Sequence, residues 1–424
     1  MTNLKDTIEL IPATGGEDNS FVGLTIVDNR IQIHYPESYC FSEEDFLFRR
    51  EVIDLLQSFS LLKHNDSSEV ELYNTHGIDS DFALLSYLWL IQDYLVNGEF
   101  SVKEKTYARG NQGNINWKRT LQQKPCVSGH NTVYLNLITE KRRDADNILI
   151  EAYRFCLKKS IDYLGWLYKL DSSFLKPIPF NENRKKLYTY TIERELKLTF
   201  EDHCKQRLTH LLNILTGLNA NCDSIDFKYG VSKYYTIFEK MIDGIYGNVA
   251  DHLQYNPIAH WHISGKEYAT SNLYPDTILE RKNESEKTIF VIDSKYYRYG
   301  HTANPSHLPE TSSIQKQITY GEHILNSAEL GVSKVYNIFI LPFDHNGQSF
   351  KTSETLRYVG YATATWKQHE SPSNSFSYEH IHTYLIDLKT VIKKWKFGHN
   401  VADCEQLITD VERRELELAG QVNS

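Results

Sequence analysis

Two short apolar runs carry carboxylates, and the second run also carries a lysine two residues after its aspartate. The stretch from Tyr274 to Tyr299 reads YPDTILERKNESEKTIFVIDSKYYRY. A charge in an apolar strand costs free energy unless it is paired or binds a cation. Because side chains alternate across a strand, Asp293 and Lys295 lie on one face. These residues are the first candidates for chemistry.

A hairpin of the two runs can place Asp276 beside Asp293, with the lysine just beyond them. Two carboxylates and a strand carbonyl, such as that of Ser294, form an oxygen site suited to Mg²⁺, with Mn²⁺ as a possible substitute. A neighbouring Lys295 can orient or deprotonate a water that attacks a phosphodiester. The alternative is a cross-strand ion pair on a solvated face.

Two flanking helices each place one polar residue among apolar ones. Glu239 lies in the apolar stripe of the first helix, about 231–247, and Gln317 lies in that of the second, which opens at Ser312 or Ser313. A nearby metal would explain a core-facing glutamate. Alternatively, Glu239 lies at the edge of its stripe, and Gln317 satisfies a backbone group. The stripes comprise Tyr235, Phe238, Ile242, Ile245 and Tyr246, and Ile314, Gly321, Ile324 and Leu325.

The elements that must position these residues occur in the order helix, three strands, helix, strand. We expect an α/β (α+β) fold with a mixed sheet flanked by helices, followed by two further strands, VGYATATW and HIHTYLIDL, and by helices from Lys389 onward. The first strand also carries His260 and His262, which we interpret as solvent-side residues rather than metal ligands. The three strands and the last one are expected near 258–263, 274–280, 287–295 and 334–341.

The amino-terminal part predicts an α+β domain. FVGLTIVDNRIQIHY indicates a hairpin, and residues 82–96 and 144–170 have helical spacing. Two prolines in DSSFLKPIPFNEN mark a linker at 171–183, which would separate a domain of residues 1–170 from one of residues 184–424. After this linker, a helix is expected to carry the residues from Leu196 to Leu215 and to end near Gly217.

Composition limits the class of protein. The 424 residues carry a formal net charge of −9, which excludes a basic protein that coats nucleic acid but not a nuclease with a local basic groove or bound metal. The six cysteines lack CxxC spacing and predict reduced thiols. The first residues show no signal peptide and no run is long enough to span a membrane, so we expect a cytoplasmic protein.

The order of elements, with Pro275-Asp276 and Asp293-Ser294-Lys295, resembles the PD-(D/E)xK nuclease core. The resemblance implies that Asp276 and Asp293 bind Mg²⁺ and that Lys295 positions the attacking water. Glu239 and Gln317 match an assisting glutamate and a glutamine that recur in this superfamily. The second carboxylate is aspartate rather than glutamate, which the pattern permits. The implied nuclease core spans about 231–342.

Further segments resemble the LlaJI-type restriction endonucleases and, more distantly, the McrC nuclease subunit of McrBC systems. They are GNINWKRTL at 113–121, DNILIEAYRF at 146–155, Phe238-Glu239, and the YPD and IDSKYY motifs, so that the resemblance covers roughly 105–342. It implies cleavage of double-stranded DNA in a hetero-oligomeric complex with a separate AAA+ GTPase motor. The chain has no GxxxxGK[ST] loop and therefore cannot be that motor.

By the same resemblance, residues 1–170 are expected to dock on the motor, and contact with DNA is a second role that this region could take. An equally simple interpretation of the GNINW segment is a glycine-asparagine turn before a buried tryptophan. Two other functions stay open: a non-catalytic regulator that stimulates the GTPase, and a stand-alone repair nuclease with the same core. The candidate contacts to the motor are Asn111, Gly113, Asn116, Trp117, Lys118 and Arg119.

Overall fold

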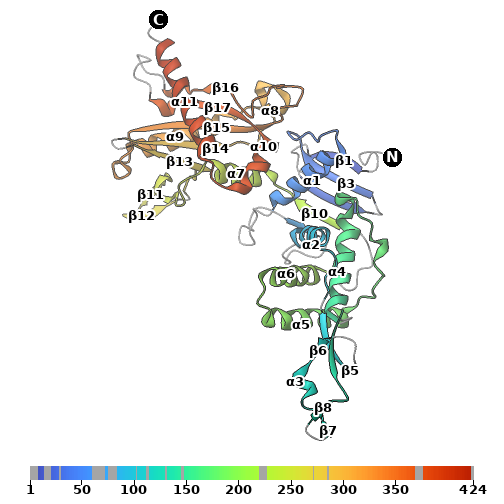
Figure 1. Ribbon diagram of the computed structural model, residues 1–424. Coiled ribbons are helices and arrows are strands. Elements are labelled where there is room, and N and C mark those ends of the chain that lie inside the picture. Colours follow the sequence, from blue (N-terminus) through green and yellow to red (C-terminus); the bar gives the residue numbers. More distant parts are fainter. Residues whose placement is uncertain are drawn as a thin grey trace. The chain divides into compact units, whose positions relative to one another are not determined.

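The computed structural model shows a mixed α/β protein with several sheets (Figure 1). The chain forms two compact units, one of Met1–Thr75 with Asp226–Ser424 and the other of His76–Ile225. The predicted linker at 171–183 lies inside the second unit, not at a boundary between units. The structure describes residues 8–13, 21–27, 30–59, 72–74, 84–101, 103–110, 114–128, 131–144, 148–218, 227–270, 272–283, 286–367 and 376–421.

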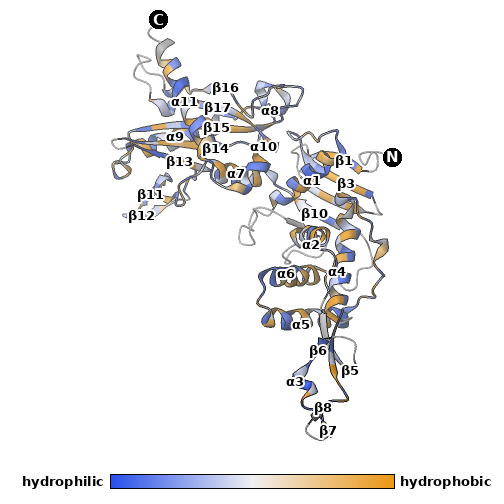
Figure 2. Cartoon of the chain, viewed as in Figure 1, coloured by the Kyte–Doolittle hydropathy of each residue, from blue (hydrophilic) through white to orange (hydrophobic). Residues whose placement is uncertain are grey.

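The first unit is built on a five-stranded mixed sheet of order β13-β14-β15-β17-β16. β13 and β14 are antiparallel, β14, β15 and β17 are parallel, and β16 is an antiparallel edge strand. The central strands are long apolar runs, as expected for strands covered on both faces; Figure 2 draws much of them in the hydrophobic colour. The strands are β13 (Thr277–Lys282), β14 (Lys287–Ser294), β15 (Lys334–Phe343), β16 (Leu356–Ala362) and β17 (Ile381–Asp387).

Helices flank this sheet, as predicted. Ile318 and Ile324 of α9 are buried with Ile289, Val291 and Phe339, which line one face of the sheet. On α7 the predicted apolar stripe is buried except for Tyr235, which is exposed, whereas Tyr234 takes its place in the core. The helices of this part are α7 (Tyr234–Tyr246), α8 (Tyr299–Thr302), α9 (Thr311–Asn326), α10 (Leu388–Lys394) and α11 (Val401–Gln421).

The first of the three expected strands does not join the sheet. β11 (His260–Ile263) pairs only with β12 (Lys266–Ala269), in a separate two-stranded hairpin. Both expected histidines are exposed there, as predicted. The alternating pattern of IAHWHI predicted a strand correctly, but such a pattern does not specify the pairing partner.

A second sheet of the same unit joins chain segments far apart in sequence, in the order β1-β3-β2-β10-β4. The predicted hairpin is confirmed as β2 against β3, and β10 then pairs antiparallel with both β2 and β4. Gly23 and Gly230 face each other, and a Cβ on Gly23 would lie 2.1 Å from the Tyr229 carbonyl oxygen. The elements are β1 (Ile8–Ala13), β2 (Val22–Val27), β3 (Arg30–Pro36), α1 (Asp45–Ser58), β4 (Leu72–Asn74) and β10 (Phe227–Val231).

The second unit contains a helical bundle and a long β-finger, formed by β5 to β9 with α3 (residues 103–144). The β-finger extends away from the bundle (Figure 1). The predicted helices at 82–96 and 144–170 are present as α2 and α4. The helix expected from Leu196 is two helices, because α5 ends at Leu198 and α6 begins at Asp202. The elements are α2 (Leu84–Asn97), α4 (Ile148–Leu164), α5 (Glu182–Leu198) and α6 (Asp202–Gly217), with β5 (Lys103–Arg109), β6 (Asn114–Ile115), α3 (Trp117–Thr120), β7 (Cys126–Ser128), β8 (Asn131–Val133) and β9 (Ile138–Asp144).

Candidate active site

The ends of β13 and β14 bring the two predicted aspartates together. The ladder pairs Thr277 with Ile292, so the next positions along it are Asp276 and Asp293. The backbone amide of Ser294 donates a hydrogen bond to Oδ2 of Asp276 at 2.8 Å. Ser294 therefore holds the first carboxylate against the strand that carries the second.

Lys295 completes this group as the sequence predicts. Its Nζ lies 2.7 Å from Oδ2 of Asp293, whose side chain is 0% exposed. The lysine side chain is 18% exposed, and its backbone amide is held by the carbonyl of Ile340 on β15 at 2.9 Å. The pair is thus buried, which argues against the alternative of an ion pair on a solvated face.

The electrostatics of the group favour a bound cation. Burial raises the pKa of Asp276 well above its ordinary value, with further contributions from the charges of Asp293 and Glu239, while Lys295 opposes the shift. Burial by itself lowers the pKa of Lys295, but the two aspartates outweigh it, so that this pKa is raised. Like charges at such short range are stabilised by a cation between them.

Buried polar atoms without partners support the same conclusion. Oδ1 of Asp293 and the hydroxyl of Ser294 are buried and have no hydrogen-bond partner in the described part of the chain, whereas Oδ2 of Asp293 forms the ion pair with Lys295. Such atoms are rare in folded proteins and call for an ion, a water or a functional role. Together with the half-buried Glu239, the donors are all oxygens, the type that Mg²⁺ prefers.

Gln317 lies beneath β14 and is fully buried. Its Nε2 donates to the carbonyl oxygen of Val291 at 2.8 Å and lies 3.4 Å from Oδ1 of Asn337. The side chain therefore satisfies a backbone group, which is the alternative raised for it from the sequence. None of the hydrogen bonds described for Gln317 reaches the carboxylates, and its described link to Asp293 runs through the backbone of β14.

Tyr320 is a functional candidate that sequence reasoning missed. Its hydroxyl donates to the carbonyl oxygen of Tyr274 at 2.7 Å, directly before Pro275 and Asp276. Burial raises the pKa of Tyr320, and Asp293 and Asp276 add to the shift. The helical spacing could have revealed it, because Tyr320 follows Gln317 by three residues and thus shares its face of α9.

Asp344, His345 and Asp387 form a second group that could hold a metal, at the ends of β15 and β17. Its carboxylates already accept hydrogen bonds. Asp387 caps α10 by accepting from the amide of Thr390 at 2.9 Å, and Asp344 accepts from the amide of Cys40 at 2.8 Å. The structure thus explains this group as a capping network that ties three chain segments together.

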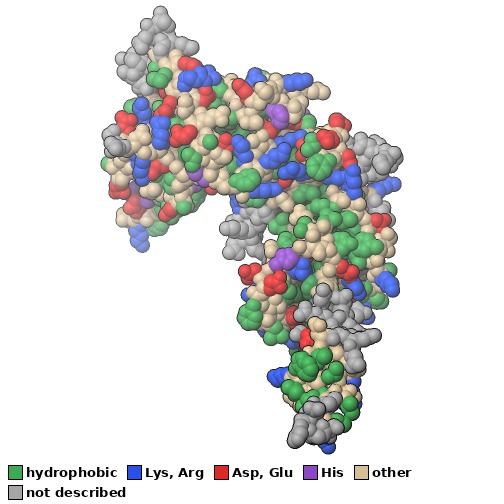
Figure 3. Space-filling view, in the orientation of Figure 1, with side chains coloured by type: hydrophobic (Ala, Val, Ile, Leu, Met, Phe, Trp, Pro, Cys, Tyr) green, Lys and Arg blue, Asp and Glu red, His purple; other side chains and the backbone are tan. Residues whose placement is uncertain are grey.

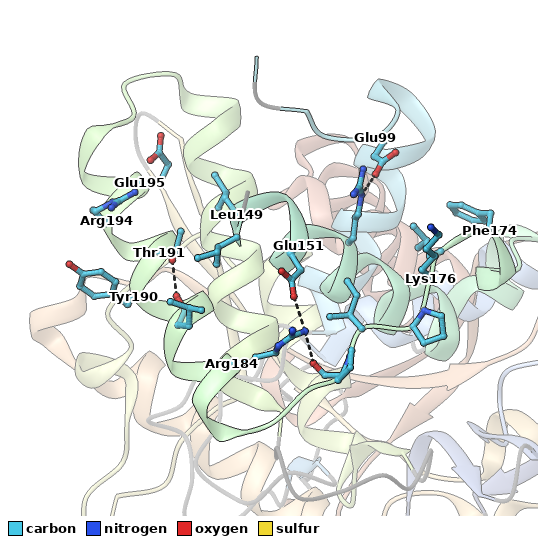
Figure 4. Close-up of a pocket in the computed structure, with 17 residues that line it drawn as sticks. Glu99, Leu149, Glu151, Phe174, Lys176, Arg184, Tyr190, Thr191, Arg194 and Glu195 are labelled. Atoms are coloured by element: carbon cyan, nitrogen blue, oxygen red, sulfur yellow. Dashed lines mark hydrogen bonds and ion pairs between the residues drawn. The ribbon is translucent and has the colours of Figure 1, made fainter. Parts of the chain in front are cut away.

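The second unit contains an open hollow of about 1210 Å³ between α4, α5 and the segment around Pro177 (Figure 4). Two of its three arginines are already paired: Arg184 lies 2.8 Å from Glu151, and Arg154 is paired with Glu99. The lining contains no buried carboxylate pair like that of β13 and β14. The chemistry of this chain is therefore better placed in the first unit.

The structure of this chain has a distant match among solved structures, and its sequence matches a known protein family. One similar solved structure is the half-complex from the tetradecameric assembly of Thermococcus gammatolerans McrB AAA+ hexamers with bound McrC, in which one chain matches at a TM-score of 0.38 and 11% identity, over 89% of this chain and 81% of that one. No curated protein matches the sequence. The sequence profile of the LlaJI restriction endonuclease matches residues 21–362. The chain therefore belongs to the LlaJI restriction endonuclease family.

Proposed function

We propose that this chain is the Mg²⁺-dependent nuclease subunit of a McrBC-like or LlaJI-like restriction system, with a PD-(D/E)xK core, and that it hydrolyses double-stranded DNA. The observation that carries the proposal is the buried pair of Asp276 and Asp293, in which Oδ1 of Asp293 has no hydrogen-bond partner and Oδ2 lies beside Lys295. A buried carboxylate pair is costly unless it serves a cation or a reaction. Membership of a restriction endonuclease family gives the reaction class.

Each residue then has a role. Asp276 and Asp293 would hold Mg²⁺ or Mn²⁺, and Glu239 would support the ion or a water around it. When bound, the ion would polarise the scissile phosphate and neutralise the charge that develops on it. Lys295 would hold the attacking water in line. Ser294 and Gln317 are positioning residues, the first through its amide on Asp276 and the second through the backbone of β14.

The partner is proposed from the sequence resemblance to McrC. We propose an AAA+ GTPase motor in a hetero-oligomeric complex, working in the cytoplasm, where restriction meets foreign DNA. Within the expected docking region 1–170, we favour the β-finger of the second unit, because Trp117 is 58% exposed rather than buried. Asn116 caps α3 there through a hydrogen bond from the Arg119 amide at 3.0 Å. Asn111 and Gly113 lie outside the described residues.

The described surface is not uniformly basic on the face shown in Figure 3. On the face shown in Figure 3, basic and acidic side chains are interspersed. The described helices include none that is long and apolar enough to cross a membrane. Affinity for the DNA backbone would therefore come from local groups, the bound ion and the partner, which is compatible with the formal charge of −9.

The test is plasmid cleavage in Mg²⁺, with GTP and with ATP, by wild type and by Asp293→Ala. Each protein is assayed with and without the product of the neighbouring AAA+ gene. Cleavage by wild type alone, and only with partner and nucleotide, supports the proposal. Cleavage without any partner favours a stand-alone nuclease, for example one in repair.

The regulator alternative makes a different prediction for the same experiment. A non-catalytic regulator would stimulate nucleotide hydrolysis equally well with and without Asp293, and neither protein would cut DNA under any condition. Because both activities could reside in one subunit, hydrolysis of GTP is measured in the same reactions.

A further inference from the structure

The β11–β12 hairpin is exposed on both of its faces. All eight strand residues are solvent-exposed, and the turn at Ser264 and Gly265 has positive φ at both residues, as in tight two-residue hairpin turns. A two-stranded hairpin alone is marginally stable in water. The β11–β12 hairpin is not paired with the sheet of β13 to β17, and it projects from the first unit (Figure 1).

One face of the hairpin is apolar and aromatic. Trp261 pairs across the strands with Tyr268, and Ile263 pairs with Lys266. The exposed fractions of Trp261, Ile263 and Tyr268 are 63%, 54% and 51%. A contiguous exposed apolar surface of this kind usually marks an interaction site.

The base of the hairpin is connected to the candidate active site by a short, hydrogen-bonded segment. The amides of Thr270 and Leu273 donate to the carbonyls of Ala259 and Pro257 at 2.8 Å and 3.0 Å, which closes the stem. The next residue, Tyr274, is anchored by the hydroxyl of Tyr320. Asp276 follows two positions later. Any duplex lying on the carboxylates therefore lies close to the base of this hairpin.

The shape and charge of the hairpin suit duplex DNA. The major groove is about 12 Å wide and admits a two-stranded β-ribbon, and a four-residue strand is about 13 Å long. The aromatic face carries Lys266 and no carboxylate. The one carboxylate, Glu267, is on the opposite face, where it contacts Nδ1 of His260 at 2.8 Å. A polyanion can thus approach the aromatic face without facing a negative charge.

We propose that the β11–β12 hairpin enters a groove of the DNA duplex, and that Trp261 and Tyr268 hold the duplex against the Asp276–Asp293 pair. The inference rests on the proposed nuclease function and adds the surface that places its substrate. Lys266, at the tip, would contact a phosphate. The hairpin is thus a positioning device, distinct from the residues that act on the phosphodiester.

The experiment measures binding separately from cleavage. Affinity for a short fluorescent duplex is determined by anisotropy in Mg²⁺, with Asp293→Asn in every protein so that the DNA stays uncut. Adding Trp261→Ala and Tyr268→Ala together should weaken binding at least tenfold, since large aromatic side chains that become buried in an interface contribute strongly to its energy. Lys266→Ala should reduce the slope of log affinity against log salt concentration by about one, the value expected for the loss of one phosphate contact. The matched control is Phe397→Ala, a ring 87% exposed outside the hairpin, which should leave the affinity within twofold.

The outcomes separate this inference from the proposed function. If wild type cuts DNA but the double substitution leaves affinity within twofold, the hairpin proposal is overturned and the nuclease stands. Unchanged affinity with loss of a dimer in sedimentation likewise overturns it, and assigns the aromatic face to a second copy of the chain. If the parent protein binds no duplex and wild type cuts none, both proposals fall. Circular dichroism of the double variant checks that the fold is retained.

Discussion

At the scale of single residues, the burial of Asp293 beside Asp276 costs folding free energy in the first unit. One carboxylate has a buried oxygen without a hydrogen-bond partner in the described part of the chain, and the other has a raised pKa because of burial and its neighbour's charge. Only Lys295 provides a direct opposite charge to Asp293 among the described ion pairs. Functional sites commonly retain such local costs, and removing them tends to stabilise the protein while abolishing activity.

The first prediction concerns Asp293→Asn. The amide keeps the shape of the side chain but removes the repulsion from Asp276 and a charged ligand. We expect cleavage to fall by at least about 10²-fold, because a metal's charge stabilisation is worth several kcal/mol. The melting temperature should stay equal or rise. A fall of several degrees in calorimetry, with activity retained, would show that Asp293 is part of a structural ion pair.

The second prediction concerns Lys295→Met, which keeps the length of the side chain and removes its charge. Cleavage should be lost, because no ammonium group remains to position a water. Binding of Mn²⁺ should be retained or strengthened, since Lys295 Nζ at 2.7 Å occupies space and charge next to Asp293. Isothermal titration calorimetry in the absence of DNA measures this directly. Weaker Mn²⁺ binding in the variant would contradict the assigned role.

At the scale of elements, α9 is the support of the site. Gln317 ties it to the carbonyl of Val291 on β14, and Tyr320 ties it to the carbonyl of Tyr274 ahead of β13. Gly321 on the same helix has no room for a side chain, because a Cβ there would lie 2.5 Å from Cβ of Tyr378. Close packing of α9 thus fixes the ends of both strands that carry the aspartates.

The third prediction follows from this support. Tyr320→Phe removes the hydroxyl and leaves the Tyr274 carbonyl without that partner, at a cost of about 1 kcal/mol in the free energy of unfolding. Cleavage should fall more than this stability loss suggests, by roughly tenfold, because misplaced reacting groups are costly. Urea unfolding measures the loss of stability, and cleavage rates at temperatures below the melting range measure the loss of activity. Equal cleavage by variant and wild type would remove Tyr320 from the positioning residues.

A buried ion pair joins two helices of the second unit. It leads to a prediction about stability and its dependence on pH. Arg207 on α6 contacts Asp93 on α2 at 2.7 and 3.1 Å, and both residues are buried. Asp93→Ala leaves the Arg207 charge without this partner and should cost about 3 kcal/mol. The exposed pair Arg154–Glu99 is the control, since Arg154→Ala should cost no more than about 1 kcal/mol.

The pH dependence of this contribution has a definite sign. Burial raises the pKa of Asp93, but hydrogen bonds from Arg207 and Asn97 outweigh it, so the pKa lies below the ordinary 3.8. The stabilisation is therefore complete above pH 3.8 and is lost as the pH falls through the lowered value of the folded state. Denaturation of wild type and Asp93→Ala at decreasing pH should converge only below this value. Convergence near neutral pH would contradict the prediction.

At the scale of the whole molecule, the first unit joins the beginning of the chain to its end. β10 inserts between β2 and β4, and Lys389 on α10 forms a buried ion pair with Glu51 on α1 at 3.0 Å. The residues between these segments form the second unit. If the proposed docking to a motor belongs to the second unit and the proposed DNA cleavage to the first, this division predicts that mutation can separate the two.

The last prediction uses that separation. Trp117→Ala removes an exposed ring from the β-finger, and exposed substitutions usually change stability by no more than about 0.5 kcal/mol. If the finger docks on the motor, cleavage and stimulation of GTP hydrolysis should fall together at limiting concentrations of motor. Binding of Mn²⁺ to the variant should equal that of wild type. Full stimulation by the variant would place docking elsewhere.

Local sequence patterns predicted the elements that hold the candidate site. Runs of apolar, β-branched and aromatic residues predicted β13, β14 and β15, and helical spacing predicted α7 and α9. The positions of Asp276, Asp293 and Lys295 on adjacent strands predicted their proximity. The reason is that a short hairpin fixes its own register. α5 was missed because two prolines preceded a polar helix, whose apolar spacing is weak.

Pairings between distant segments were not available from the sequence. The separation of β11 from the main sheet, the insertion of β10 next to β2, and the contact of Tyr320 with the Tyr274 carbonyl each depend on how elements pack. The sequence by itself therefore determined the family motifs and the strand and helix positions around the carboxylates, and it indicated the chemistry that we propose for them. Only the tertiary structure decided which strands form one sheet, how the chain divides into units, and which polar atoms stay without partners, because backbone pairing and burial depend on segments distant in sequence.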